Sequence, residues 1–202
     1  MKQLNIALLV LLFCASCKSK VDKITPTEKF IKSLTTIETR NSFLEDVIIL
    51  DQKVRTDATK IEQIYGYKSE ELREARQKMM ATDDLLIEQI SLYLDNYGFP
   101  SKKDYSSDAL MAPYMVLHHS SELGNRNKYR KKYFPILYEA YKKGDFDGLA
   151  FFLGRMHHFE FGNFMSFENP YTEEFEIQEL TKALGLTVIM EEIDEKMMKT
   201  TK

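Results

Sequence analysis

Apolar residues recur at helical spacing through most of this chain, and this periodicity argues against most folds that are not helical. The clearest example spans residues 43–56, where four apolar residues follow at intervals of three or four: Phe43, Val47, Leu50 and Val54. No segment shows the apolar-polar alternation, bounded by hairpin turns, that is typical of a strand. We therefore predict an all-α fold, a single compact domain of about six to eight helices.

Start and stop signals place several of these helices. Two segments have the form of a capping box, and each predicts a helix start: Thr25-Pro26-Thr27-Glu28 and Ser42-Phe43-Leu44-Glu45. Ser69 predicts the start of another helix, which ends before Gly98 and Pro100. Asp145 is expected to cap a later helix. Further helices are predicted over residues 108–119, 129–143, 149–158, 173–184 and 188–198.

The first residues have the build of an export signal. Lys2 precedes an apolar run over residues 6–13, which is too short to span a bilayer as a mature helix. The segment that follows, Ala15-Ser16-Cys17, resembles the lipobox of bacterial lipoproteins, although Cys14 stands where Leu, Val or Ile is usual. In a lipobox the last cysteine is acylated and becomes the first residue of the mature protein. An ordinary signal peptide that is cut nearby is the alternative.

The lipobox-like motif sets the expected domain organisation and location. Residues 1–16 are predicted to be a lipoprotein signal peptide, 17–25 a polar tether and 26–202 the helical domain. Lipidation of Cys17, by palmitate or a similar acyl chain, would anchor the chain to a membrane of the bacterial cell envelope, on the periplasmic side or at the outer membrane. Both cysteines lie in the targeting segment, so the mature domain would have no disulfide and no thiolate nucleophile.

The charge balance limits the classes of partner. Asp and Glu number 31 and Lys and Arg number 28, for a net charge of -3. Nucleic-acid binding needs clustered excess positive charge, so we expect no nucleic-acid partner. The sequence has no Gly-rich phosphate loop, nucleophile elbow or dinucleotide fingerprint, and we expect no cofactor. The expected partners are the membrane, through the lipid, and an unidentified small ligand or envelope protein.

A candidate binding pocket centres on one turn of the helix predicted over residues 43–56. Asp51 and Arg55 are four residues apart and can pair, with Gln52 beside them. Facing inward, such a pair could present a fixed guanidinium to an anionic ligand. His119 and Arg155, from later helices, complete the candidate pocket. The alternative is a structural ion pair on a half-buried helix face.

A second hypothesis is a metal site. His119 and Glu122 are three residues apart, as are His157 and Glu160, so each pair could share a helix face. The two pairs together would supply two nitrogen and two oxygen ligands. The alternative is that these histidines cap helix ends or are partly buried there.

Several short motifs resemble those of a bacterial helical family that is known only as a domain of unknown function, with the pattern Asp-Gln-x-x-Arg, Gly-Trp-Pro, His-Ala. The matching segments are Asp51-Gln52-x-x-Arg55, Gly98-Phe99-Pro100, with Phe for Trp, and His119-Ser120. The resemblance covers residues 44–186 and implies a shared fold and pocket. It implies no activity, because none is established for the family. The final Tyr-Gly-Thr-Gln element of the family keeps only its glycine here, at Gly162.

These observations lead to two functional hypotheses. The first is a non-enzymatic lipoprotein of the cell envelope that binds a ligand or a protein through its helical domain. The second is an enzyme, a metal-assisted hydrolase that uses the His/Glu pairs. Metal analysis of the purified domain, with His119→Ala as a control, distinguishes the two, and the most useful structural observation is whether Asp51, Arg55, His119 and Arg155 converge on one cavity.

Overall fold

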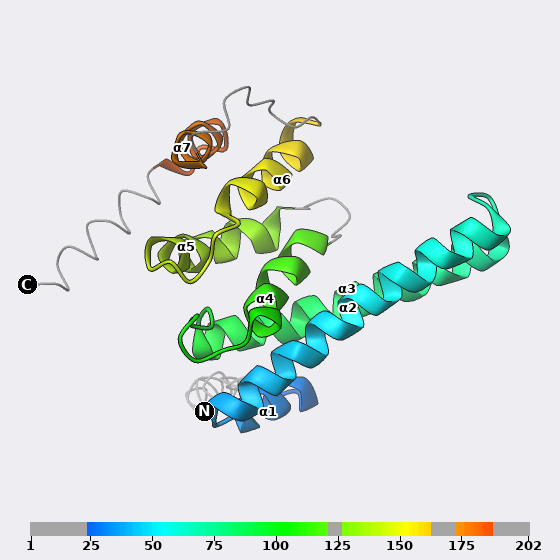
Figure 1. Cartoon of the computed structure of the whole chain (residues 1–202), viewed down its shortest axis with the longest axis horizontal. Helices are drawn as coiled ribbons and strands as arrows, with labels where there is room; N and C mark the ends of the chain where they lie inside the picture. Colours follow the sequence, from blue (N-terminus) through cyan, green and yellow to red (C-terminus); the bar gives the residue numbers. More distant parts are fainter. Residues whose placement is uncertain (1–23, 121–126, 163–172, 188–202) are drawn as a thin grey trace, which may run out of the picture.

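The computed structural model describes residues 24–120, 127–162 and 173–187. These residues form helices joined by short connections, without a strand (Figure 1). The helices are α1 (Pro26–Ser33), α2 (Ile37–Tyr65), α3 (Glu70–Tyr97), α4 (Ser107–His119), α5 (Lys128–Lys142), α6 (Leu149–Phe161) and α7 (Glu173–Ala183). The prediction of an all-α fold is confirmed, and the seven helices of the described residues agree with the six to eight expected.

Some predicted segments lie outside the described residues. They are the signal peptide, most of the tether and the last helix predicted over residues 188–198. Among the residues that are described, no helix combines the length and the apolar content that a membrane-spanning segment needs.

Side-chain caps begin two helices where the sequence predicted them. The Thr25 hydroxyl accepts a hydrogen bond from the backbone N–H of Glu28, 3.1 Å away, and α1 starts at the proline between them. The Ser69 hydroxyl accepts from the N–H of Leu72 at 3.1 Å and starts α3. Gly98 ends α3 with a φ of +73°, a conformation that side chains other than glycine rarely adopt.

The predicted helix start at Ser42 is wrong, because a stronger cap lies upstream. Thr36 and Thr39 bond to each other's backbone N–H reciprocally, so α2 already begins at Ile37. The helix then runs through the whole predicted segment to Tyr65, a length of 29 residues. The β-branched cluster around Thr36 therefore starts α2.

Asp145 does not cap α6, contrary to the prediction. Its carboxylate accepts a hydrogen bond from the backbone N–H of Lys102, 2.7 Å away, and so holds the loop between α3 and α4. The N-cap residue of α6 is Gly148, so no side chain caps the start of this helix. Helix α6 continues to Phe161, three residues beyond the predicted end at His158.

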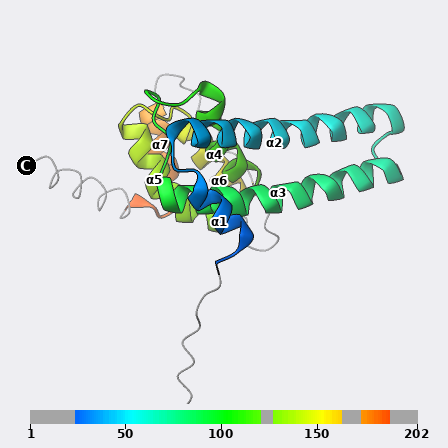
Figure 2. The same ribbon diagram turned by 90° about the horizontal axis from the view of Figure 1, so that it is seen from below.

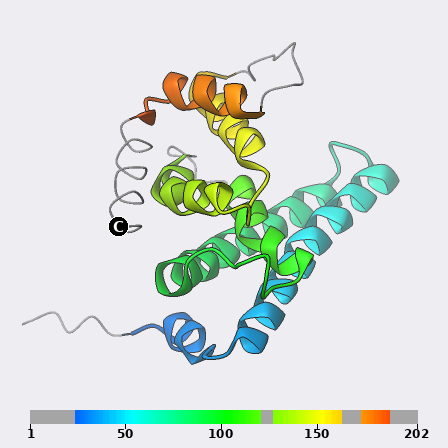
Figure 3. The same cartoon turned by 60° about the vertical axis from the view of Figure 1, so that its left-hand side comes forward.

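Helix α4 lies at the centre of the fold (Figure 3). It packs against α2, α3, α5 and α6, while α1 packs on α3 and α7 packs on α6. A helix surrounded in this way needs an apolar surface on most sides, which its sequence supplies. Its residues Ala109, Ala112, Val116 and Leu117 are buried in the main core.

Helices α2 and α3 form an antiparallel hairpin that extends well beyond the other helices (Figures 1 and 2). The main core draws residues from all the described helices, but none of them comes from the outer half of this hairpin. There, only Val54, Ala58 and Leu72 are buried apolar side chains. The hairpin tip is therefore a two-helix projection with little hydrophobic support of its own.

Helix α1 lies at the opposite end of the hairpin from its tip (Figure 2). The Tyr97 hydroxyl donates to the backbone carbonyl of Ile31 at 2.9 Å, and the rings of Phe30 and Phe43 meet edge to face. These contacts fix the first described residues at the base of the hairpin.

Candidate functional site

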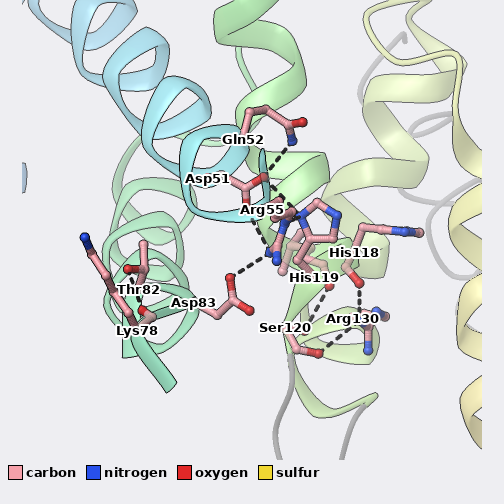
Figure 4. A network of polar contacts seen from close by, with 11 residues as sticks. Asp51, Gln52, Arg55, Lys78, Thr82, Asp83, His118, His119, Ser120 and Arg130 are labelled. Atoms are coloured by element: carbon pink, nitrogen blue, oxygen red, sulfur yellow. Dashed lines mark hydrogen bonds and ion pairs between the residues drawn. The ribbon is translucent and has the colours of Figure 1, made fainter. Parts of the chain in front are cut away.

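A cluster of polar side chains joins α2, α3 and α4 midway along the hairpin, where its outer half leaves the body (Figure 4). Arg55 of α2 donates to the Asp51 carboxylate at 3.1 Å and to the Asp83 carboxylate of α3 at 2.7 Å. His119, the last residue of α4, lies with its Nδ1 3.0 and 3.1 Å from the two oxygens of Asp51. Because Asp51 is 1% exposed and Asp83 is 7% exposed, both carboxylates depend on these partners.

The geometry assigns the ring proton of His119. Nδ1 faces both oxygens of Asp51, so an unprotonated Nδ1 would direct its lone pair at a carboxylate. With a proton on Nδ1 the ring donates to Asp51 and keeps Nε2 as its acceptor when neutral. Nδ1 then cannot also accept from Arg55 Nε, although the two nitrogens are 2.9 Å apart. Arg55 therefore pairs with the carboxylates.

The two carboxylates respond differently to the same surroundings. Burial acts to raise the pKa of Asp51, but the hydrogen bond and charge of His119, together with Arg55, lower it below its ordinary value. Burial raises the pKa of Asp83, and Arg55 offsets this only in part, while the charge of Asp51 adds to the rise. Asp51 is therefore the more firmly ionised of the pair.

Gln52 lies at the outer side of this cluster. Its side-chain amide donates to the second oxygen of Asp51 at 2.8 Å. The structure thus brings together four residues of the predicted pocket: Asp51, Gln52, Arg55 and His119.

Arg155, the fifth predicted residue, belongs to different surroundings. It lies on α6, with its guanidinium 4.4 Å from the ring centre of Phe159. Its charge also helps to hold down the pKa of His118, which burial and neighbouring cations lower to about 3. The described contacts of Arg155 therefore place it on the α6 side of α4, facing His118 rather than the carboxylates.

The four predicted metal ligands take different partners where the structure describes them. His119 is paired with Asp51, and the buried His157 packs on the ring of Phe161, 4.6 Å between centres. Glu160 accepts from Asn127 at 3.0 Å and pairs with Lys131 at 3.1 Å. The described residues hold no group of three or more His, Cys, Asp or Glu side chains placed to bind a metal.

Glu122, the fourth predicted metal ligand, lies outside the described residues. The metal site built from His119, Glu122, His157 and Glu160 therefore stays a prediction.

Sequence reasoning missed two polar residues of this region. Asp83 lies on the face of α3 that carries Leu86, Ile87 and Ile90, and a carboxylate on an apolar face signals a partner on another helix. Arg130 is fully buried and donates to the backbone carbonyls of His118 and Ser120 at the end of α4. It thereby stabilises carbonyls that have no partner within the helix.

A groove of about 620 Å³ runs along the hairpin beyond the polar cluster. Its floor is apolar and its edges carry charges of both signs. Residues from α2 (Val54, Asp57, Lys60, Ile61, Tyr65) and from α3 (Glu71, Glu74, Ala75, Lys78) line it. An elongated groove with an apolar floor suits an amphipathic helix better than a compact small molecule.

The chemistry of the polar cluster is mainly structural. The Arg55 Nη2, the two carboxylates and the imidazole Nδ1 bond to one another, and they connect three helices at the point where the hairpin leaves the body. Comparison with protein-family models, with curated proteins and with solved structures finds no match for this chain.

Proposed function

We propose that this chain is a lipid-anchored lipoprotein of the bacterial cell envelope whose helical domain binds a protein without catalysis. In this proposal the binding surface is the groove of the α2–α3 hairpin. The polar cluster at the inner end of the groove is a brace that fixes the hairpin to the body.

The groove is the observation that carries this proposal. The outer half of the hairpin has few buried apolar residues, yet its groove exposes the ring of Tyr65, which is 56% exposed, beside the apolar side chains of Ile61 and Ala75. Two helices can bury only the stripe along which they touch, so their remaining apolar surface is available to further helices. A protein that lays a helix in the groove would cover this surface.

The brace supports a binding role because it fixes the direction of the hairpin. Arg55 ties α2 to α3, and His119 ties α4 to α2 through Asp51. A rigid projection loses less conformational entropy when it binds than a flexible one. We further propose that the two motifs shared with the similar family, Asp51-Gln52-x-x-Arg55 and His119-Ser120, are the motifs that form this brace.

The anchor is tested by acylation. Cells that make the chain are fed labelled palmitate, and the intact protein is expected to carry the label and to sediment with membranes. Cys17→Ala is expected to lose the label, whereas Cys14→Ala retains it. Label that persists in Cys17→Ala would overturn the anchor.

The binding role is tested by photo-crosslinking in intact cells. A photoreactive amino acid replaces Ile61 in the groove, or Lys103, an exposed residue of the loop between α3 and α4 that lies outside the groove, as a matched control. Illumination is expected to produce a defined higher-mass adduct from position 61 and none from position 103. Equal labelling from both positions, or none from position 61, would remove the groove from the proposal.

A further inference from the structure

The charges along the hairpin groove are ordered. Two ion pairs set the register of the helices: Arg55 with Asp83 midway along the hairpin, and Glu62 with Arg76 nearer the tip. Each pair is separated from the other by one stretch of seven residues on either helix. Lys60 of α2 and Lys78 of α3 therefore lie at the same level between them.

The same register places negative charge at the tip end of the groove. Glu74 and Glu71 follow the level of Lys60 and Lys78 toward the tip. None of these four side chains forms an ion pair with another residue that the structure describes. The remaining carboxylate of the groove, Asp57, pairs with Lys53 at 2.7 Å, and this hydrogen bond, together with the charges of Lys60 and Lys78, lowers its pKa.

An apolar strip lies between and beyond these bands. Ile61 and Ala75 form the floor near the lysine level, and Val54 continues it toward the base. At the tip end, Tyr65 lines the groove and is 56% exposed, so this end presents an aromatic ring, whereas Tyr67 lies under the Arg76 guanidinium and outside the groove. The exposed ring of Tyr65 can therefore pack on the apolar floor of such a groove in another molecule.

We infer that the partner of the hairpin is a second copy of this chain, packed antiparallel so that the two hairpins form a four-helix bundle. This inference rests on the proposed function, because it names the protein that fills the groove. A two-fold axis between the lysine level and the glutamates places Lys60 and Lys78 of each copy opposite Glu71 and Glu74 of the other. The same axis brings Tyr65 of each copy against the groove floor of the other.

The order of the charges favours this occupant. Apart from Asp57, which pairs with Lys53, the groove carries its positive and negative side chains at separate levels. Such a surface is complementary to itself when a two-fold axis lies between the two levels. Parallel packing in the same register would instead place lysine against lysine and glutamate against glutamate.

The test is the mass of the mature, full-length protein by sedimentation equilibrium in density-matched detergent. The wild type is expected to be a dimer that dissociates as salt is raised. The double variant Lys60→Glu with Lys78→Glu is expected to weaken self-association by roughly 100-fold, because four carboxylates then face one another at each of the two equivalent contacts. The double variant Glu71→Lys with Glu74→Lys is expected to weaken it by a similar factor, because four lysines then face one another there. Mixing the two double variants is expected to restore the dimer.

A matched control carries the same charge change outside the groove: Lys29→Glu with Lys103→Glu, both exposed in the wild type. It is expected to remain a dimer. Helical circular dichroism of every variant must equal that of the wild type, so that loss of the dimer reports on the interface. A wild type that stays monomeric at all concentrations, or a mixture that fails to restore the dimer, would overturn the inference.

The outcome also separates this inference from the proposed function. A monomeric wild type whose Ile61 adduct contains a different protein would overturn the second copy and keep the groove as a binding surface. A monomer with no adduct from position 61 would overturn both.

Discussion

Arg55 is the residue on which the brace depends, because one guanidinium serves two buried carboxylates. Arg55→Ala leaves Asp51 and Asp83 unpaired in the interior, so we expect a loss of about 3 kcal/mol in the free energy of unfolding, measured in urea. Arg73→Ala removes an ion pair with Glu70 that is exposed to solvent, so it is expected to leave the free energy of unfolding nearly unchanged. Equal losses in the two variants would argue against the brace.

His118 is a residue-scale source of pH dependence. Burial and nearby cations lower its pKa to about 3, so the ring is neutral in the folded state. As the pH falls below about 6.5, the unfolded chain gains a proton there that the folded chain does not, and stability is lost down to pH 3.

We expect this residue to cost about 2.5 kcal/mol of stability between pH 7 and pH 4.5. His118→Phe keeps a ring against Phe151, whose centre lies 5.2 Å away, and cannot titrate. Urea unfolding of this variant at pH 7 and at pH 4.5 is expected to show a difference in the free energy of unfolding that is smaller than the wild-type difference by this amount. His118→Gln, which is polar and also untitratable, should behave alike. If both variants lose as much stability between pH 7 and pH 4.5 as the wild type does, His118 is not the source of this pH dependence.

The residues of the cluster differ in how far the sequence could predict them. Asp51 and Arg55 are one turn apart on a single helix, so their pairing follows from spacing alone. Asp83 and His119 are brought to them by the packing of α3 and α4, and local pattern carries no information about that distance. In the sequence, Arg130 is one of several basic residues at a helix start, and only the packing of α5 against the end of α4 buries it and gives it carbonyl partners.

Among the helices, boundaries were harder to predict than existence. Thr25, Ser69 and Gly98 act within their own turn, and the predictions based on them are confirmed. The start of α2 depends on reciprocal bonds between Thr36 and Thr39, a pair that lacks the Glu or Gln of the usual capping box. The prediction that Asp145 caps α6 failed for another reason, because its carboxylate accepts a hydrogen bond from the backbone N–H of Lys102 in the loop between α3 and α4.

The outer half of the hairpin is expected to open locally without unfolding the body. Its amides between Ala58 and Ala75 should exchange with solvent faster than those of α4, because the main core contains none of this segment. Leu72 is 1% exposed and holds the two helices together there. Leu72→Ala is expected to speed local exchange at least tenfold and to leave α4 unchanged, as measured by hydrogen exchange and mass spectrometry. Equal acceleration in α4 would mean that the hairpin and the body unfold together.

At the scale of the whole molecule, the antiparallel bundle has a consequence for the anchors. Helix α1 lies at the base of each hairpin, so an antiparallel pair has one α1 at each end. Residues 17–25 can extend to about 30 Å. If Cys17 carries a lipid, as proposed, the two lipids of one dimer would reach the same membrane when the bundle lies along its surface.

The hairpin can be shortened to separate association from folding. We expect that replacing residues 58–80 by a short glycine-rich turn yields a folded monomer, because the main core and the Arg55–Asp83 pair are both kept. The thermal midpoint should change by only a few degrees, since few buried apolar side chains are lost: Ala58 and Leu72. The measurements are circular dichroism during heating and the mass at sedimentation equilibrium. A dimer that persists would place the interface outside the hairpin, and a chain that no longer folds would make the projection part of the folding unit.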